Sequence, residues 1–185
     1  MSGGASFTQT SGPPAAIQGG GGFVAGQAQY ADVNGDGRDD LIYQGTDNQF
    51  WLALSNGTGF AQTSGPPAAT HGGPGFMPGE AQYADVNGDG KADLIYQGVD
   101  NQFWLALSTG TGFDQSQPSA LQHGGGFIAG EAQYGDVNGD GKADLVYQGL
   151  DNKIYVSLSN GTTLASSAQL VADYGGTFQP GMFHV

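Results

Sequence analysis

The chain has 185 residues, of which 35 are glycine, and its 17 acidic and 4 basic residues give a formal net charge of −13. Because so few basic residues cannot form a basic patch, we expect neither nucleic acid nor an anionic membrane surface as a partner. No stretch approaches the roughly 20 apolar residues of a transmembrane helix, so membrane insertion is not expected. The absence of cysteine excludes disulfides and thiolate metal sites.

The sequence contains an internal repeat of about 50 residues, a length typical of β-propeller blades. The string Asp-Val-Asn-Gly-Asp-Gly begins at Asp32, Asp85 and Asp136, and near-identical segments surround each copy. With the strands of one unit named a to d, the chain reads d, abcd, abcd, abcd, a. This pattern predicts a single propeller-type repeat domain over residues 1–185. Its units lie at about residues 6–58, 59–111 and 112–163, with a partial unit at 164–185.

Short alternating segments bounded by turn residues predict four strands in each unit. In the second unit, strand a lies near residues 80–84, b near 93–97, c near 102–108 and d near 112–116. No window shows a sustained 3.6-residue periodicity, and glycine at this frequency disfavours helix. We therefore expect an all-β protein of four-stranded antiparallel β-propeller blades, three per chain plus partial strands.

Each copy of the string opens the pattern D-x-N-x-D-G-x-x-D, which is typical of a calcium loop. Side-chain oxygens at alternate positions and a backbone carbonyl at the seventh position are donors that calcium prefers, and the glycine fits a sharp turn with positive φ. An EF-hand would need a glutamate at position 12, where the copies have Tyr43, Tyr96 and Tyr147. About three calcium ions per chain are expected. The predicted ligands are Asp32, Asn34, Asp36, Arg38 and Asp40; Asp85, Asn87, Asp89, Lys91 and Asp93; and Asp136, Asn138, Asp140, Lys142 and Asp144.

Aspartate, asparagine and glycine also form turns without any metal, so a purely structural loop is the alternative. Each of the three copies, however, brings together carboxylates that repel one another unless a cation neutralises them. We therefore expect the ions to act as folding elements that clamp strands a and b, rather than as catalytic ions.

The signature Asp-Val-Asn-Gly-Asp-Gly-x-x-Asp-Leu resembles that of the FG-GAP/VCBS repeat family, the calcium-loop β-propellers of integrin α-subunit heads and many secreted proteins. The resemblance implies blades with calcium in the loop between strands a and b. The chain is also similar to a subset of this family, the fungal integrin-like lectins of the Psathyrella velutina lectin type. These lectins bind sugars between adjacent blades and carry an aromatic, glycine-rich loop where this chain has residues 71–79 and 123–130.

Candidate sugar-binding groups recur once per unit. A sugar has an apolar C–H face and a rim of hydroxyls, so its pocket needs an aromatic ring and planar hydrogen-bonding groups. The alternative for aromatic residues is core packing between blades, which we favour for Phe76, Phe127 and the equivalent tyrosines Tyr30, Tyr83 and Tyr134. The candidate ligand-binding residues are Trp51, Trp104, Tyr155, Gln44, Gln97, Gln148, His71, Gly72, Gly73, His123, Gly124 and Gly125.

These features lead to two hypotheses for the function. The first is a calcium-stabilised lectin that binds carbohydrate between its blades. The second is a structural or protein-interaction propeller without a sugar site. An enzyme is disfavoured, because no nucleophile–base set can be singled out and the repeat-equivalent Glu80 and Glu131 would lie on separate blades.

Three blades are fewer than the four to eight that natural propellers use. We therefore expect a homo-oligomer, with a homodimer as the leading arrangement, in which the terminal strands near residues 7–10 and 182–185 pair with another copy. The calcium loops favour an extracellular or secreted location. The N-terminus shows no charged segment followed by an apolar core, so no signal peptide is visible, and a cytoplasmic lectin is the alternative.

Overall fold

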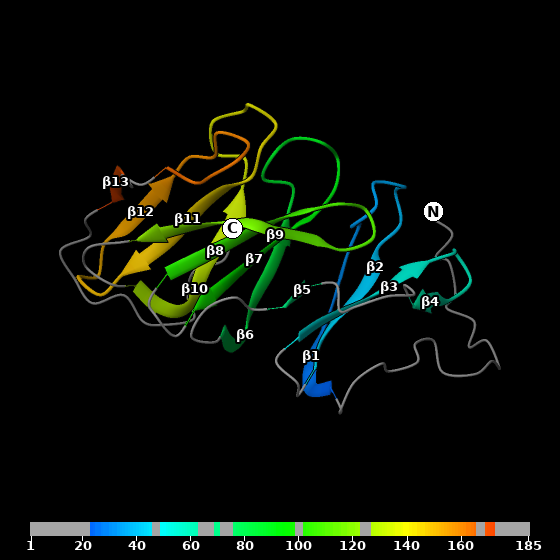
Figure 1. The fold of residues 1–185 in the computed structure, drawn as a ribbon. Helices are drawn as coiled ribbons and strands as arrows, with labels where there is room; N and C mark the ends of the chain where they lie inside the picture. The colour runs from blue at the N-terminus through cyan, green and yellow to red at the C-terminus, as the bar shows by residue number, and fades with distance from the viewer. Residues whose placement is uncertain are drawn as a thin grey trace, which may run out of the picture.

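A computed structural model of the protein describes residues 23–45, 49–62, 69–70, 76–98, 102–122, 127–165 and 169–172. Within these ranges the chain forms β-strands and turns, and no helix is present that could cross a membrane. The strands make three separate sheets that follow one another along the chain (Figure 1). The expectation of an all-β protein with propeller-like blades is confirmed.

Each sheet, here called a blade, pairs its strands in chain order, and all pairs are antiparallel. The first blade contains β1 (Phe23–Ala31), β2 (Asp40–Gly45), β3 (Gln49–Ser55) and β4 (Phe60–Gln62), and the short β5 (Ala69–Thr70) also pairs with β3. The second contains β6 (Phe76–Ala84), β7 (Asp93–Gly98), β8 (Gln102–Ser108) and β9 (Phe113–Gln122). The third contains β10 (Phe127–Gly135), β11 (Asp144–Gly149), β12 (Ile154–Ser157) and β13 (Gln169–Ala172).

Strands a and d of the second blade are longer than the sequence pattern predicts. β6 begins at Phe76 rather than near residue 80, and β9 continues to Gln122 rather than ending near residue 116. In β6 the residues 76–81 oppose only residues 96–98 of β7, so the strand carries a bulge. The bulge interrupts the alternating pattern of side chains, so the sequence pattern did not predict the first half of the strand. Residues 76–79 and 127–130, expected in glycine-rich loops, therefore belong to strands.

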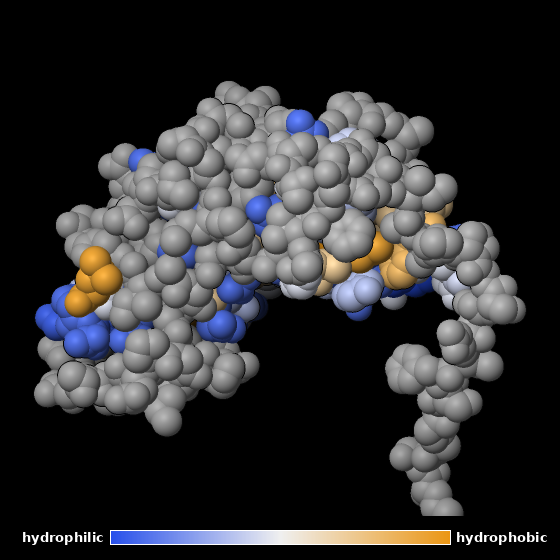
Figure 2. Space-filling view, turned by 90° about the horizontal axis from the view of Figure 1, so that it is seen from below, coloured by the Kyte–Doolittle hydropathy of each residue, from blue (hydrophilic) through white to orange (hydrophobic). Residues whose placement is uncertain are grey.

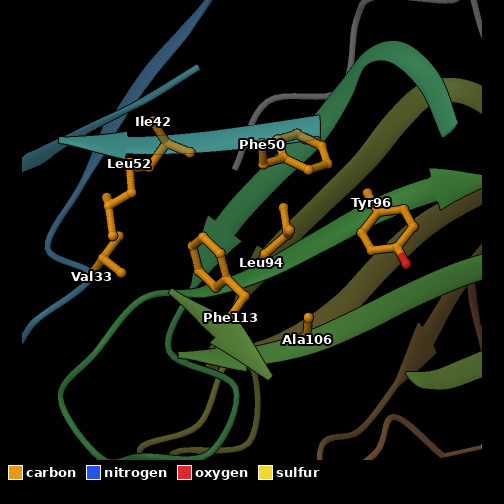
Figure 3. Packing of buried hydrophobic residues seen from close by; sticks show 9 residues of the cluster. Val33, Ile42, Phe50, Leu52, Leu94, Tyr96, Ala106 and Phe113 are labelled. Carbon is orange, nitrogen blue, oxygen red and sulfur yellow. The ribbon is translucent and has the colours of Figure 1, made fainter. Parts of the chain in front are cut away.

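The hydrophobic core lies between neighbouring blades rather than inside one of them. We call the side of a blade that meets the next blade its forward face, and the side that meets the previous blade its rear face. The first core joins Val33, Ile42, Phe50 and Leu52 of the first blade to Ala81, Leu94, Tyr96, Ala106 and Phe113 of the second (Figure 3). The next core joins Val86, Ile95, Phe103 and Leu105 to Ala132, Leu145, Tyr147 and Leu164.

Both faces of the middle blade are covered in this way, and its central strand shows the result. Successive side chains of a strand point to opposite faces, and every residue of β7 is buried. This explains why the strand reads as a continuous apolar run rather than as an apolar–polar alternation.

Three hydrogen bonds accompany each core, and they join equivalent atoms at both interfaces. Between the first two blades they run from Gln29 Nε2 to the Ala81 carbonyl (2.6 Å), from Ser108 Oγ to the Val33 carbonyl (2.6 Å) and from the Ala92 N–H to the Asp32 carbonyl (2.8 Å). Between the second and third blades they run from Gln82 Nε2 to the Ala132 carbonyl (2.8 Å), from Ser159 Oγ to the Val86 carbonyl (2.6 Å) and from the Ala143 N–H to the Asp85 carbonyl (2.8 Å). The interfaces are therefore copies of one another in polar as well as apolar contacts.

Candidate metal loops and inter-blade seams

The three aspartate-rich loops connect the first and second strands of each blade, at what we call the loop end. Their sixth-position glycines, Gly37, Gly90 and Gly141, have φ values of +82°, +83° and +82°. This left-handed conformation is strained for any residue with a Cβ atom, which accounts for the glycine in the repeated pattern.

The first aspartate of each loop is held by backbone amides. Asp136 Oδ1 accepts hydrogen bonds from the N–H groups of Gly139 (2.7 Å) and Asp140 (3.1 Å), and its Oδ2 accepts one from Gly141 (2.8 Å). These bonds, led by the one from Gly141, hold the pKa of Asp136 below its usual value. Asp32 and Asp85 accept the same hydrogen bonds, so the first carboxylate is held in the same position in each loop.

The fifth and seventh positions form an ion pair that the sequence analysis did not foresee. The distance from the basic nitrogen to the carboxylate is 2.6 Å for Arg38–Asp36 and 2.8 Å for Lys91–Asp89. The hydrogen bond to Asp89 raises the pKa of Lys91. The seventh residue was assigned only a backbone carbonyl, because a calcium-loop pattern does not specify its side chain.

The ninth position is a buried carboxylate that ties the loop to the end of strand c. In the second loop Asp93 is 0% exposed, and it accepts hydrogen bonds from the N–H groups of Val86 (2.9 Å) and Ser108 (2.7 Å). Burial, reinforced by the nearby Asp89 and Asp85, raises the pKa of Asp93 to about 6 despite these bonds. A carboxylate in this setting is costly to keep ionised unless a cation lies close to it.

The donor set of each loop fits a divalent cation in chemistry and in charge. In the second loop Asp85, Asp89 and Asp93 contribute three negative charges and Lys91 contributes one positive charge, which leaves −2. Over the described residues, however, no three carboxylate or imidazole groups come together closely enough to hold a metal. The loop amides occupy both oxygens of Asp85 and the Lys91 ammonium contacts Asp89 Oδ2, so these oxygens are already used within the loop.

Loops of successive blades also lie against each other. A Cβ atom on Gly35 would lie 3.3 Å from Lys91 Cγ and 3.4 Å from the Gly90 carbonyl oxygen. The aliphatic part of Lys91 therefore covers the loop of the preceding blade, and the hydrogen bond between Ala92 and Asp32 lies beside it. These contacts join residues about one repeat apart, so no local sequence pattern could have predicted them.

The predicted aromatic and glutamine ligands lie at the opposite end of the blades, the seam end. Trp104 pairs across strands with Tyr96 on the rear face of the second blade, whereas Gln97 pairs with Phe103 on its forward face. Residues from one unit therefore point into different gaps. The gap between the first two blades combines Gln44 with Trp104, and the next gap combines Gln97 with Tyr155.

The glutamines lie deeper in these gaps than the outer aromatic rings. Gln44, Gln97 and Gln148 are 4%, 2% and 1% exposed, whereas Trp51, Trp104 and Tyr155 are partly buried. Phe103, Tyr147 and Tyr155 form a continuous aromatic layer in the second gap, with ring centroids 5.8 and 5.5 Å apart. The residues before Gln97 in β7 are apolar on both faces of the strand, and this pattern could have predicted that Gln97 is buried.

The tyrosines assigned to the core behave differently in the three blades. Tyr83 and Tyr134 pack against the two cores, as predicted, and burial raises the pKa of Tyr83. Tyr30 is 61% exposed, so the core assignment is wrong for this residue. Its face has no preceding blade among the described residues. The side chains of Phe76 and Phe127, and the predicted ligands His71, Gly72, Gly73, His123, Gly124 and Gly125, lie outside the described residues.

Three antiparallel sheets packed face to face, each with the same aspartate-rich loop, define a repeat protein of the β-propeller type. The FG-GAP-like repeat profile matches residues 32–96 and 85–147, and the chain belongs to this family. A solved structure described as "Crystal Structure of TcdB2-TccC3" is similar, with a TM-score of 0.53 and 26% sequence identity over 65% of this chain. The chain spans 6% of the length of that structure's chain. No curated protein shows a significant match to the sequence.

Proposed function

We propose that this protein is a calcium-stabilised, non-catalytic β-propeller module that binds carbohydrate in the seams between its blades. The observation that carries the proposal is the composition of each seam. A planar amide from one blade and an aromatic ring from the next face the same gap, Gln44 with Trp104 and Gln97 with Tyr155. An aromatic ring packs on the apolar face of a sugar, and the partly buried rings of Trp104 and Tyr155 are the seam groups that a sugar can reach, since Gln44 and Gln97 are 4% and 2% exposed and lie beneath them.

The strands on either side of residues 123–126 end and begin at the seam end. Residues 123–126 join the end of β9, where Gln122 pairs with Gln102, to the start of β10, where Phe127 pairs with Gly149. Both points lie at the seam end of their blades.

In this proposal calcium stabilises the fold and does not contact the sugar. The loop end has the carboxylate donors and a net charge of −2 per loop in the second and third blades, which one divalent cation would neutralise. Loading requires the fifth-position carboxylate to turn from its basic partner towards the ion. Calcium loops of extracellular modules are filled at the calcium levels outside cells, so the proposal favours an extracellular location.

A glycan array probed with the calcium-loaded protein tests the proposal. We expect a defined set of bound glycans, and we expect the Trp104→Ala variant to lose signal at one class of site while Trp104→Phe retains it. Thermal unfolding of each variant serves as the control for folding. An array without binding, obtained with folded protein, would contradict the sugar-binding proposal and leave a protein-interaction module as the function.

A further inference from the structure

We infer that the basic side chain at the seventh position of each loop substitutes for calcium in the calcium-free protein and competes with calcium for the fifth-position carboxylate. The three residues concerned are Arg38, Lys91 and Lys142. The inference rests on the calcium binding of the proposed function. It gives these side chains two effects that a backbone carbonyl ligand does not have: they stabilise the calcium-free loops and they lower the affinity of the loops for calcium.

Basic residues are scarce in this chain, and most of them occupy this one position. The chain has four basic residues against 17 acidic ones, and Lys153 is the one that lies outside the loops. Hydrophilic residues on the face seen from below lie in separate groups rather than in one charged patch (Figure 2). A tight turn needs aspartate, asparagine and glycine but no basic residue at its seventh position, so the basic residue in all three loops calls for another reason.

The seventh residue holds both oxygens of the fifth-position carboxylate. In the second loop the Lys91 N–H donates to Asp89 Oδ1 (2.9 Å), and Lys91 Nζ donates to Asp89 Oδ2 (2.8 Å). The backbone bond leaves room on Oδ1 for a cation, whereas the ammonium group lies where a divalent ion bound to Oδ2 would be. The side-chain contact recurs in the other two loops, at 2.6 Å in the pair Arg38–Asp36 and at 3.3 Å in the pair Lys142–Asp140.

Packing holds the aliphatic part of these side chains in place. A Cβ atom on Gly35 would lie 3.3 Å from Lys91 Cγ, and one on Gly88 would lie 3.5 Å from Lys142 Cγ. A Cβ atom on Gly161, in the turn that follows β12, would lie 3.5 Å from Lys142 Cε. Because neighbouring loops restrict the side chain, the ammonium group stays beside its carboxylate at a low further cost in conformational entropy.

The charges of the loop give the basic group opposite effects in the two states. In the second loop Asp85, Asp89 and Asp93 carry three negative charges, and Lys91 reduces the net charge to −2. In the calcium-free loop the ammonium group therefore relieves repulsion between carboxylates, whereas beside a bound divalent ion it is a repelling like charge. An interaction that exists in the calcium-free state alone lowers the apparent calcium affinity.

This role differs in sign from a purely structural one. A side chain that served to hold the loop in its calcium-binding shape would increase calcium affinity, and its removal would weaken binding. A side chain that competes with calcium does the reverse, so its removal should strengthen calcium binding while it destabilises the calcium-free protein. Two measurements on the same variant therefore separate the two roles.

The test uses the full chain with methionine at all three seventh positions: Arg38→Met, Lys91→Met and Lys142→Met together. Methionine keeps much of the aliphatic contact with the neighbouring loop and removes the charge. Isothermal titration with calcium chloride should show a Kd about tenfold lower than that of the wild type. Thermal unfolding in chelator should show a Tm lower by about 3–12 °C, since three exposed ion pairs are lost.

Two control variants separate competition from changes in net charge and shape. Lys153→Met removes one positive charge from the turn between β11 and β12, where Lys153 Nζ lies 3.9 Å from Asp151 Oδ2, and should leave the calcium Kd within about twofold of the wild type. Its matched partner is the single variant Lys91→Met, which also replaces the triple variant if the latter does not fold. Lys91→Arg should retain the wild-type Kd and Tm, because the first loop has arginine at this position.

The outcomes distinguish this inference from the proposed function. If calcium binds the wild type and the folded methionine variants bind it equally or more weakly, the inference is overturned and calcium stabilisation stands. A calcium-free Tm that does not fall in the methionine variants would also overturn the inference. If neither the wild type nor the variants bind calcium, both the inference and the calcium part of the proposed function fail, while the glycan array still tests sugar binding.

Discussion

The two ends of each blade are built by different physical means. At the loop end, carboxylates are held by backbone amides and one basic side chain, and the same contacts recur in all three loops. At the seam end, aromatic rings and a buried amide fill the gap between blades. Under the proposed function the two ends have different roles: the loop end fixes the blades, and the seam end binds the ligand. The predictions below test this division.

Among single substitutions, the largest effect is expected in the core between blades. Phe103→Ala removes a ring that is 2% exposed and packs against Tyr147 of the next blade, and it should lower the free energy of unfolding by about 3–5 kcal/mol. Phe103→Leu keeps most of the volume and should cost about 1.5 kcal/mol or less. Chemical denaturation measures both. If both variants lose the same free energy of unfolding, the cavity left by the phenylalanine ring is not the cause of the destabilisation.

The ninth-position carboxylate should be the most sensitive residue of the loop end. Asp93→Ala leaves the buried N–H groups of Val86 and Ser108 without their acceptor, which should cost about 2–4 kcal/mol. Asp39→Ala is the control, since Asp39 is exposed and the other two loops have alanine at that position. The control should change the free energy of unfolding by less than about 0.5 kcal/mol in urea denaturation.

Removing calcium should destabilise the protein without changing its fold. At a calcium concentration of 100 times Kd, each bound ion contributes about 2.7 kcal/mol, so removing three ions should cost about 8 kcal/mol and lower the Tm by roughly 15–30 °C. Differential scanning calorimetry with calcium, with magnesium and with chelator makes the comparison. An unchanged Tm would show that the loops are turns that need no metal.

The smallest effect is expected for a single hydrogen bond between blades. Ser159→Ala removes the bond from Ser159 Oγ to the Val86 carbonyl and should cost about 1 kcal/mol. The equivalent Ser55→Ala should cost less, because within the described residues Ser55 Oγ makes no such bond to a carbonyl of a preceding blade. Urea denaturation of both variants measures this difference.

The repeat, the strand type and the loop conformation could be predicted from sequence, because each depends on residues close together in the chain. Strand c of the second blade was predicted with the bounds that the structure gives, and the glycine at position six has the expected positive φ. The start of β6 was missed because a bulge breaks its alternation. Gln97 and Trp104 face different gaps, because Trp104 pairs with Tyr96 and Gln97 pairs with Phe103. Since side chains alternate between the two faces of a strand, the sequence could have predicted this difference.

The contacts between blades were beyond prediction from local patterns. Lys91 covers the loop that contains Gly35, and Ser108 bonds to Val33, across separations of 56 and 75 residues. The same reasoning explains the error at Tyr30. Its sequence context matches that of Tyr83, and only its position in the order of blades makes it exposed.

The most direct test of the division between the two ends is a calorimetric titration of a glycan identified on the array into calcium-loaded wild type and Trp104→Ala. The account predicts that the variant retains the calcium-dependent Tm of the wild type while the number of sugar sites falls or their affinity drops by tenfold or more, as expected for the loss of about 1.4 kcal/mol. Unchanged sugar binding by a folded Trp104→Ala variant would contradict the assignment of the ligand site to the seams.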